Sequence, residues 1–223
     1  MAELITAARF ADLELVDWRW VLRRLEASFR TSGSFADATD FVARLGRLGD
    51  ELDHHPAIDV RFPGVVRVAL STRDQGGVTN LDVDLARAIS AAAAESEMRS
   101  EPRRAQVAEI AIDVLDIAAV LPFWQAALGY EPEPSPDGRP PIALVDPRGH
   151  GPGVWFQQMD EPRPQRNRIH IDIDVAHDEV DERLAATIEA GGTLVSDARA
   201  RAFWVLADPE GNEACLCTWQ DRG

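Results

Sequence analysis

The second half of the chain repeats one order of predicted elements, and this repeat constrains the fold more than any other feature. Each copy opens with a strand of alternating apolar and polar residues, at 108–114 and again at 169–175. A helix follows in each copy, over 118–128 and 178–190, and stops at glycine. Further strands are expected at 142–145 and 154–158 in the first copy and at 193–195, 203–207 and 213–219 in the second. The sequence therefore predicts two similar modules with the order strand, helix, strand, strand, strand.

The first half predicts two helices and a sheet. Between Ser34 and Asp53, apolar residues recur every three or four positions, which indicates a helix with one apolar face and Ser34 as its N-cap. A second helix is expected from Thr79 to about Glu97, with Thr79 and Asp82 spaced as a capping box, so we assign Asp82 to capping rather than to chemistry. Strands are expected within 18–31 and over 65–70. The whole chain is therefore expected to be an α+β protein.

A polar stretch that contains a proline, 98–106, separates the two halves. It follows an alanine-rich helix and precedes a new apolar strand, as linkers between domains often do. We expect two domains, one over 1–99 and the other over 105–223.

The charge of the chain excludes several classes of function. The formal net charge is -15, and all 23 basic residues are arginine. Such an acidic protein is not expected to bind nucleic acid non-specifically, because that binding needs a basic surface. No apolar run approaches the 18 residues typical of a membrane span, and the N-terminus lacks the pattern of a secretion signal.

The two cysteines, Cys215 and Cys217, are two positions apart in a predicted strand, so their side chains lie on one face. That geometry strains a disulfide, and we expect two small buried residues in a reducing, cytoplasmic setting.

Two of the five histidines are adjacent, in Asp53-His54-His55-Pro56 at the end of the first long helix. An ordinary histidine titrates near pH 6.5, which suits proton transfer at neutral pH. The proline forbids further helix, so packing alone does not explain the pair. Asp53 and Glu51 lie beside the histidines, and either carboxylate could accept an imidazole N–H and fix its tautomer.

This stretch, with Ser71-Thr72 and Gly76-Gly77-Val78-Thr79 downstream, resembles the pterin-4a-carbinolamine dehydratase family over roughly residues 10–97. The resemblance implies an antiparallel sheet packed with helices, and dehydration of a 4a-hydroxytetrahydropterin to quinonoid dihydropterin and water without a cofactor. It assigns acid and base catalysis to His54 and His55. It also implies a homo-oligomer. The expected substrate-binding residues are Glu51, Asp53, Ser71 and Thr72.

The chain departs from this family at Arg73, where a third histidine usually stands. A guanidinium keeps its proton at any usable pH, so Arg73 cannot act as a base. It could still donate hydrogen bonds to the leaving oxygen, and we count it among the expected catalytic residues at the cost of weakened activity.

The second half resembles the vicinal oxygen chelate superfamily, which includes glyoxalase I, over roughly residues 107–219. The motifs that carry this resemblance are Pro122-Phe123-Trp124, Asn167-Arg168-Ile169-His170 and the turn Asp208-Pro209-Glu210-Gly211-Asn212-Glu213. The resemblance implies paired modules that form a cupped sheet, and in its metal-dependent members a divalent ion on the inner face. Matching strand by strand puts His170 and Glu213 at two ligand positions. Glu109 and either Gln157 or Gln158 fall near the other two. Alternation along 169–174 also puts His170, Asp172 and Asp174 on one face, and these donors could hold zinc, nickel, manganese or iron(II). Many relatives bind small molecules without metal, so both alternatives stay open.

The leading hypothesis is a pterin dehydratase joined to a glyoxalase-like domain that binds an unknown small molecule. The first alternative is a pterin-binding or other small-molecule-binding protein without turnover. The second places a lyase, dioxygenase or isomerase activity in the C-terminal half. We expect the tryptophans of that half, Trp124, Trp155, Trp204 and Trp219, to be core residues rather than a ligand cage.

Overall fold

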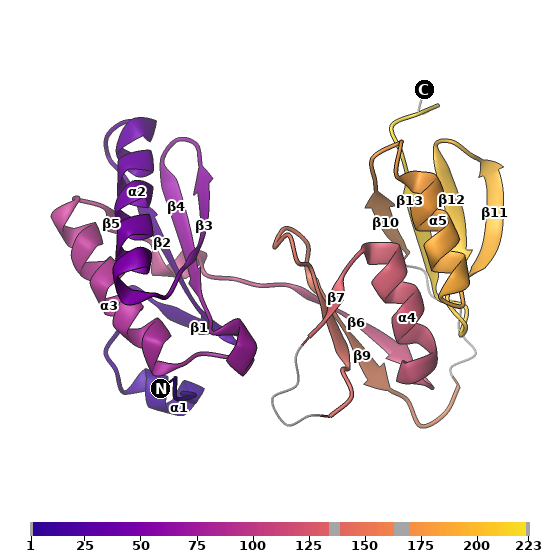
Figure 1. Ribbon diagram of the computed structural model, residues 1–223, viewed down its shortest axis with the longest axis horizontal. Helices are drawn as coiled ribbons and strands as arrows, with labels where there is room; N and C mark the ends of the chain where they lie inside the picture. The colour runs from indigo at the N-terminus through magenta and orange to yellow at the C-terminus, as the bar shows by residue number, and fades with distance from the viewer. Residues whose placement is uncertain (1, 134–138, 163–169, 222–223) are drawn as a thin grey trace. The chain divides into compact units, whose positions relative to one another are not determined.

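The computed structural model describes residues 2–133, 139–162 and 170–221. They form two compact units, the first reaching Val107 and the second beginning at Ala108 (Figure 1). Both units combine helices and sheets, which confirms the predicted α+β class. No helix within these residues has the length and apolarity needed to cross a membrane.

The first unit is an antiparallel sheet with two long helices on one face. The sheet order is β1-β2-β4-β3, and β5 pairs with β2. The strands are β1 (Arg19–Val21), β2 (Arg24–Arg30), β3 (Ala57–Arg61), β4 (Val65–Leu70) and β5 (Arg99–Ser100). The helices are α1 (Ala7–Ala11), α2 (Phe35–Leu52) and α3 (Asn80–Glu95), with short 3-10 turns η1 (Arg73–Gln75) and η2 (Pro102–Arg104). The sequence predicted α2, α3, β1, β2 and β4 but not α1 or β3.

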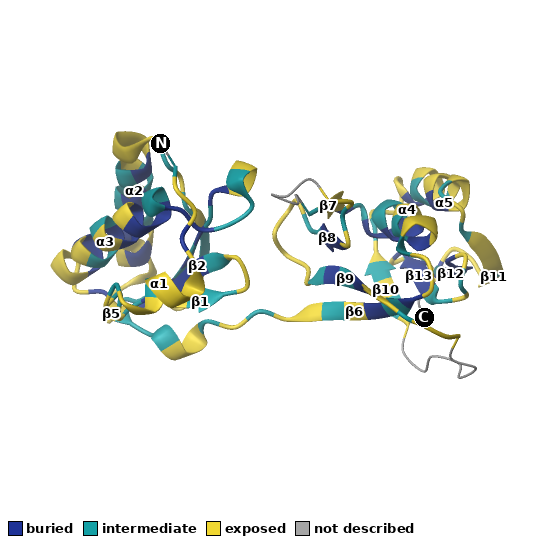
Figure 2. Cartoon of the chain, turned by 90° about the horizontal axis from the view of Figure 1, so that it is seen from below, coloured by how far each residue is buried: buried dark blue, intermediate teal, exposed yellow. Residues whose placement is uncertain are grey.

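The core of the first unit lies between the sheet and the helices (Figure 2). Alternate residues of β2 and β4 face it, as the period of two along a strand requires. On the other face of β2, Glu26 and Ser28 are buried as well. From α2 it receives Ala38, Phe41 and Leu45, three or four positions apart. The predicted apolar stripe is longer than the buried one, because Phe35 and Leu52 at its two ends are exposed.

The predicted N-cap Ser34 and the predicted capping box of Thr79 and Asp82 are both present, and Ser34 also forms a capping box. Ser34 caps α2 with Asp37 as its reciprocal partner, and Thr79 caps α3 with Asp82. In each case the side chain of the N-cap and that of the third helical residue satisfy N–H groups that the first turn leaves without a helical partner. These local signals explain why the two helix starts could be predicted.

The second unit consists of two modules with the predicted element order. The first contains β6 (Glu109–Val114), α4 (Ile117–Leu128), β7 (Glu131–Pro132), β8 (Ala143–Val145) and β9 (Gly153–Gln158). The second contains β10 (Ile171–Asp174), α5 (Val180–Glu189), β11 (Thr193–Arg199), β12 (Phe203–Ala207) and β13 (Glu213–Cys217). Residues 167–169, where we predicted the motif before His170 and the start of the strand, lie outside the described residues.

Each module has its own four-stranded sheet, and the two sheets share one topology. Their orders are β6-β9-β8-β7 and β10-β13-β12-β11, so in each the first strand lies parallel to the last. The helices α4 and α5 contribute to a common core with both sheets. Paired modules are therefore confirmed.

The turn between β12 and β13 joins the two modules. The carboxylate of Asp208 is almost fully buried and accepts hydrogen bonds from Trp124 Nε1 (2.9 Å) and from Asn212. The carboxylate of Glu210 accepts hydrogen bonds from the backbone N–H groups of Leu115 and Asp116, at the start of α4. The turn thus accepts hydrogen bonds from a buried indole N–H and from N–H groups at the start of a helix, all in the other module. These bonds are a physical reason for the aspartate and the glutamate in the sequence of the turn.

The cysteines follow prediction and the tryptophans do so in part, since Trp155 is only half-buried. Trp124 and Trp204 are buried, but Trp219 is 68% exposed and its prediction as a core residue is wrong. Its ring contacts that of His177, with 5.4 Å between centroids. Both cysteines are buried and free, as expected.

Part of the predicted linker, 98–106, packs against the first unit. Met98 belongs to the first core, β5 pairs with β2, and the Glu101 carboxylate lies 2.9 Å from Arg30 Nε. Hydrogen bonds from Arg30 and Arg99 lower the pKa of Glu101 despite its partial burial.

We predict that fragments 1–107 and 108–223 each fold and unfold cooperatively. A fragment 1–98 should be less stable than 1–107 by about 1 kcal/mol or more, because it lacks β5 and the charged hydrogen bonds of Glu101. Urea unfolding of the three fragments measures this difference. If the fragments 1–107 and 108–223 both stay unfolded, the prediction of independent folding is wrong.

Candidate functional site

His54 is fixed by a buried carboxylate. Its Nε2 atom lies 2.7 Å from Oδ1 of Asp82, and the two side chains are 12% and 0% exposed. Because a carboxylate only accepts hydrogen bonds, the contact places a proton on Nε2 and leaves Nδ1 of the neutral ring as an acceptor. The structure therefore selects one tautomer of His54.

The second oxygen of Asp82 is held by a buried hydroxyl network. Oδ2 accepts hydrogen bonds from the backbone N–H of Thr79 (2.7 Å) and from the hydroxyl of Thr72 (2.8 Å). The two threonine hydroxyls lie 2.7 Å apart. Asp82 thus performs two tasks, since one oxygen caps α3 and the other orients His54.

The end of α2 brings His54 to this network. Asp53 ends the helix in the left-handed conformation (φ 48°, ψ 37°), which aspartate tolerates better than most residues, and the N–H of His54 returns to the carbonyl of Gly49. A Cβ atom on Gly49 would lie 3.1 Å from His55 Cδ2 and 3.3 Å from the His54 carbonyl oxygen. Glycine at 49 therefore lets the histidine pair pass close to the helix.

His55 lies in a different environment from His54. Its side chain is 60% exposed, and Nε2 lies 3.0 Å from Oδ1 of Asp50, which is itself exposed. The predicted carboxylate partners, Glu51 and Asp53, are therefore wrong, because the two imidazoles contact Asp82 and Asp50 instead. Asp50 lies in the last turn of α2, and His55 follows the C-cap residue Asp53 by two positions. The chain turns back at Asp53, which brings His55 close to Asp50.

The other predicted residues of this site lie on the segments that carry His54 and Thr72. Thr72 is buried within the hydroxyl network, whereas Ser71 is half-buried at the end of β4. Arg73 directly follows Thr72, begins η1 and is exposed. Backbone hydrogen bonds between Thr72 and Gly77 close the turn that carries Arg73. Glu51 and Asp53 are exposed at the end of α2.

In the second unit the predicted metal ligands lie on two sheets. Glu109 pairs with Gly153 and Asp113 with Gln157, so Glu109 and Gln157 share one face of the β6–β9 pair. Gln158 faces the other way, and its amide donates to the carbonyl of Leu115. His170 immediately precedes β10, and Glu213 begins β13.

His170 joins a group of donors that does not include Glu213. The ligand atoms of His170, Asp172 and Cys215 all lie within 4.8 Å of one another, and His170 Nε2 is 3.3 Å from Asp172 Oδ1. Burial and the carboxylate of Asp172 raise the pKa of the Cys215 thiol to about 12. Among the residues that the structure describes, this is the group of histidine, cysteine and acidic side chains with the spacing of metal ligands.

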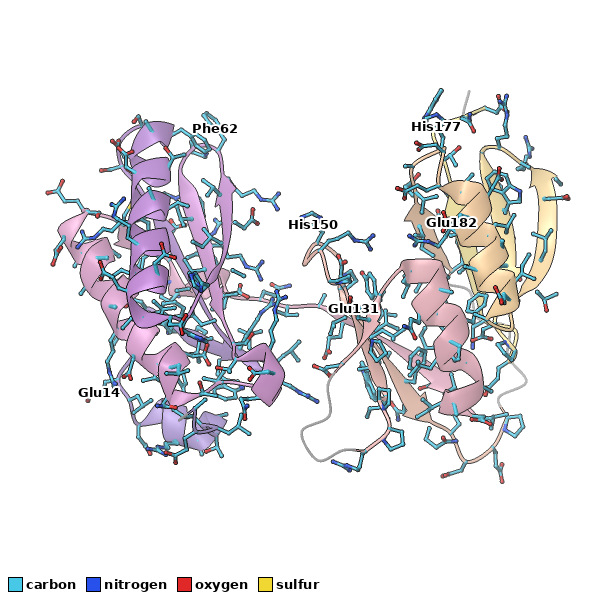
Figure 3. The ribbon with its side chains drawn as sticks, viewed as in Figure 1. Glu14, Phe62, Glu131, His150, His177 and Glu182 are labelled. Atoms are coloured by element: carbon cyan, nitrogen blue, oxygen red, sulfur yellow. The ribbon has the colours of Figure 1, made fainter. Side chains whose placement is uncertain are left out.

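A cavity of about 480 Å³ lies next to this group in the second unit, a size typical of small-molecule sites. Its lining includes Asp172, Asp174 and Glu179 and residues of the β8–β9 loop. His150 lies at the tip of this loop (Figure 3). The loop is built around Asp146. Burial alone would raise the pKa of Asp146, but hydrogen bonds from Gly151, Arg148 and His150 outweigh burial and hold it at about 2.

The comparisons with known proteins identify both units. Residues 3–92 match the model of the pterin 4 alpha carbinolamine dehydratase family. A protein of Sulfolobus acidocaldarius named for this dehydratase is 35% identical over 77 residues, which are 34% of this chain and 82% of that protein. One of Thermosynechococcus vestitus is 38% identical over 95 residues, covering 40% of this chain and 95% of that protein. The chain belongs to the pterin-4-alpha-carbinolamine dehydratase family.

This membership rests on the first unit, and residues 109–217 match the model of the glyoxalase-like domain. Both predicted resemblances are thus confirmed. A transcriptional coactivator/pterin dehydratase from Brucella melitensis is 28% identical in a solved structure, with a TM-score of 0.38, covering 41% of this chain and 99% of that one. A glyoxalase/bleomycin resistance protein/dioxygenase family enzyme from Burkholderia phytofirmans is 22% identical, with a TM-score of 0.40, covering 51% and 98%.

Sequence reasoning missed the carboxylates that contact His54 and His55. Asp82 was assigned to capping alone, and its spacing in α3 carries no sign that its second oxygen reaches a histidine 28 positions earlier. Cys215 was missed as a partner of His170 and Asp172 for the same reason, since two strands far apart in sequence bring it to them. Alternation along 169–174 puts His170 and Asp172 on one face, so that part of the group could be predicted.

Proposed function

We propose that the first unit is a hydro-lyase that dehydrates a 4a-hydroxytetrahydropterin to quinonoid dihydropterin and water. The observation that carries this proposal is His54, fixed in one tautomer by the buried Asp82 within the Asp-His-His-Pro segment of a family member. A pterin is the proposed ligand of this unit, and the reaction needs no cofactor because it moves only protons and water.

The two histidines can share the proton transfers of this elimination. The reaction breaks the bond between C4a and its hydroxyl oxygen and removes a proton from a ring nitrogen. We assign removal of that proton to Nδ1 of His54, because Nε2 is committed to Asp82 and the carboxylate stabilises the imidazolium that forms. His55 is exposed beside Asp50 and is the proposed donor of a proton to the departing hydroxyl.

The remaining residues of the site are proposed to bind and orient the pterin. Ser71 lies at the end of β4, and Glu51 and Asp53 lie at the end of α2, beside the histidine pair. Thr72 acts through Asp82, to which its hydroxyl donates. Arg73, one position beyond Thr72, would donate hydrogen bonds to the leaving oxygen.

The direct test is an assay of the purified full chain with a carbinolamine pterin, monitored by formation of quinonoid dihydropterin. A rate above that of the uncatalysed reaction is expected. If the rate equals the uncatalysed one while pterin still binds, the first unit is a binding protein, and the hydro-lyase proposal is wrong.

The substitution Arg73→His should raise turnover. It restores a third group that can exchange a proton near neutral pH, and one positioned acid or base contributes about 10² to 10⁴ in rate. The increase is expected in kcat, measured against the parent chain under identical conditions. Arg87→His, on an exposed part of α3, is the matched control and should leave the rate unchanged. No gain in Arg73→His would show that position 73 takes no part in proton transfer.

For the glyoxalase-like unit we propose a small-molecule ligand in the cavity and a divalent metal ion beside it. The cavity has apolar walls from Ile110, Leu128 and Val154 and charged groups at its rim, which suits a compact polar molecule. The metal proposal is supported by a histidine, a carboxylate and a thiol within mutual reach. A bound metal would supply Lewis-acid chemistry of the kind that lyases, isomerases and dioxygenases use.

We also propose that the protein forms a homo-oligomer. Phe35 and Phe62 form an exposed aromatic pair, with ring centroids 6.5 Å apart and Phe62 85% exposed at the turn between β3 and β4 (Figure 3). Exposed aromatic side chains that touch each other are frequent at subunit contacts. Light scattering on the full chain and on Phe62→Ser tests this proposal.

A further inference from the structure

We propose that the metal ion of the glyoxalase-like unit is zinc, or an ion of similar softness, held by His170, Asp172 and Cys215. This inference rests on the proposal that the unit binds a divalent metal. It differs from the set expected by resemblance, because Asp172 and Cys215 do not belong to that set and Cys215 was not expected to bind a metal.

Strand pairing brings the three side chains together. Asp172 of β10 is the direct partner of Cys215 in the parallel β10–β13 ladder, so both side chains point to the same face. The opposite face carries Ile171, Ile173 and Leu216, which pack in the core. His170, two positions before Asp172, contacts it from the same side.

The distances suit a tetrahedral ion. Two ligand atoms each about 2.0 Å from a tetrahedral zinc are about 3.3 Å apart. The structure places His170 Nε2 and Asp172 Oδ1 3.3 Å apart. A sulfur ligand at about 2.3 Å would lie about 3.5 Å from each of them. All three atoms already lie within 4.8 Å of one another, so small side-chain shifts complete the geometry.

The chemistry of the donors selects the metal. Magnesium and calcium prefer oxygen ligands alone, whereas imidazole nitrogen with thiolate sulfur is typical of zinc sites. Three protein ligands leave one position open, as in catalytic zinc sites. Asp172 also lines the cavity of about 480 Å³, so the open position is next to the proposed small-molecule site.

The set expected by resemblance has less support. Glu109 and Gln157 belong to the sheet of the first module, and within the described residues Glu213 is not among the side chains that share a metal-sized group with His170. Glu213 and Cys215 are on the same face of β13, two positions apart. A single pair of variants therefore distinguishes the two sets.

The experiment uses the full chain after treatment with a chelator, loaded with Zn²⁺ for elemental analysis and with Co²⁺ for spectroscopy. We expect one ion per chain and a near-ultraviolet absorption band from thiolate bound to cobalt. Cys215→Ser should abolish the band and weaken Zn²⁺ binding by more than the about 10- to 100-fold that loss of an outer-shell partner costs. His170→Ala should weaken binding similarly. Cys217→Ser is the matched control, since Cys217 is buried on the same face but outside the group.

The outcomes separate this inference from the one on which it rests. Absence of stoichiometric metal in the wild-type protein would overturn both. One ion per chain that survives Cys215→Ser and is lost in Glu213→Ala would overturn the proposed ligand set and retain the metal. Circular dichroism establishes that each variant is folded. If Cys215→Ser does not fold, Asp172→Asn on the exposed side chain serves instead, with loss of binding expected and unchanged binding contradicting the inference.

Discussion

Replacing His54 by alanine is expected to lower the rate of carbinolamine dehydration by about 10² to 10⁴. The buried carboxylate of Asp82 holds the His54 imidazole in a single tautomer, with 2.7 Å between Nε2 and Oδ1. His55 contacts the exposed carboxylate of Asp50 instead. Removing the His54 imidazole takes away a positioned proton acceptor. The loss should fall on kcat, because His54 is proposed to act on the reacting bond rather than to anchor the pterin. Stopped-flow measurement of quinonoid dihydropterin gives both constants.

Two controls make this result specific. His177→Ala removes a half-exposed histidine in the other unit and should leave the rate unchanged. Added imidazole should restore part of the activity of His54→Ala, which a purely structural defect would not allow. Asp82→Asn should also lower kcat, because an amide can donate to Nε2 and thereby select the wrong tautomer. A His54→Ala enzyme within about threefold of wild type would show that His54 is not the base.

Asp208→Ala is expected to destabilise the glyoxalase-like unit by about 3 kcal/mol or more. The carboxylate is 3% exposed and accepts hydrogen bonds from Trp124 Nε1, from the backbone of Glu210 and from Asn212. Its removal leaves the buried indole N–H without a partner and releases the turn. For a domain of this size the loss corresponds to a fall in Tm of roughly 10 to 20 °C.

Tryptophan fluorescence during urea unfolding measures this effect, since four of the six tryptophans lie in the second unit. Asp197→Ala, on an exposed part of β11, is the matched control and should change stability by less than about 0.5 kcal/mol. The unfolding transition of the first unit should not move. Equal stability of Asp208→Ala and wild type would mean that the turn does not hold the modules together.

Local signals account for the parts of the fold that were predictable. The starts of α2 and α3 follow from capping boxes, and their lengths follow from apolar spacing. The two modules of the second unit follow from alternation in β6 and β10 and from the glycines after α4 and α5. The short elements α1 and β3 were missed because five residues carry too little periodicity to distinguish a helix or strand from a loop.

The sequence by itself determined the class of the fold, its modular order and the presence of a histidine pair at a helix end, because these depend on residues close together in the chain. Only the tertiary structure decided which groups act with them. Asp82 reaches His54 because α3 packs beside the end of α2, and Cys215 reaches His170 and Asp172 because β13 pairs in parallel with β10. Contacts between residues tens of positions apart depend on packing and strand register, which leave no periodic signal in the sequence.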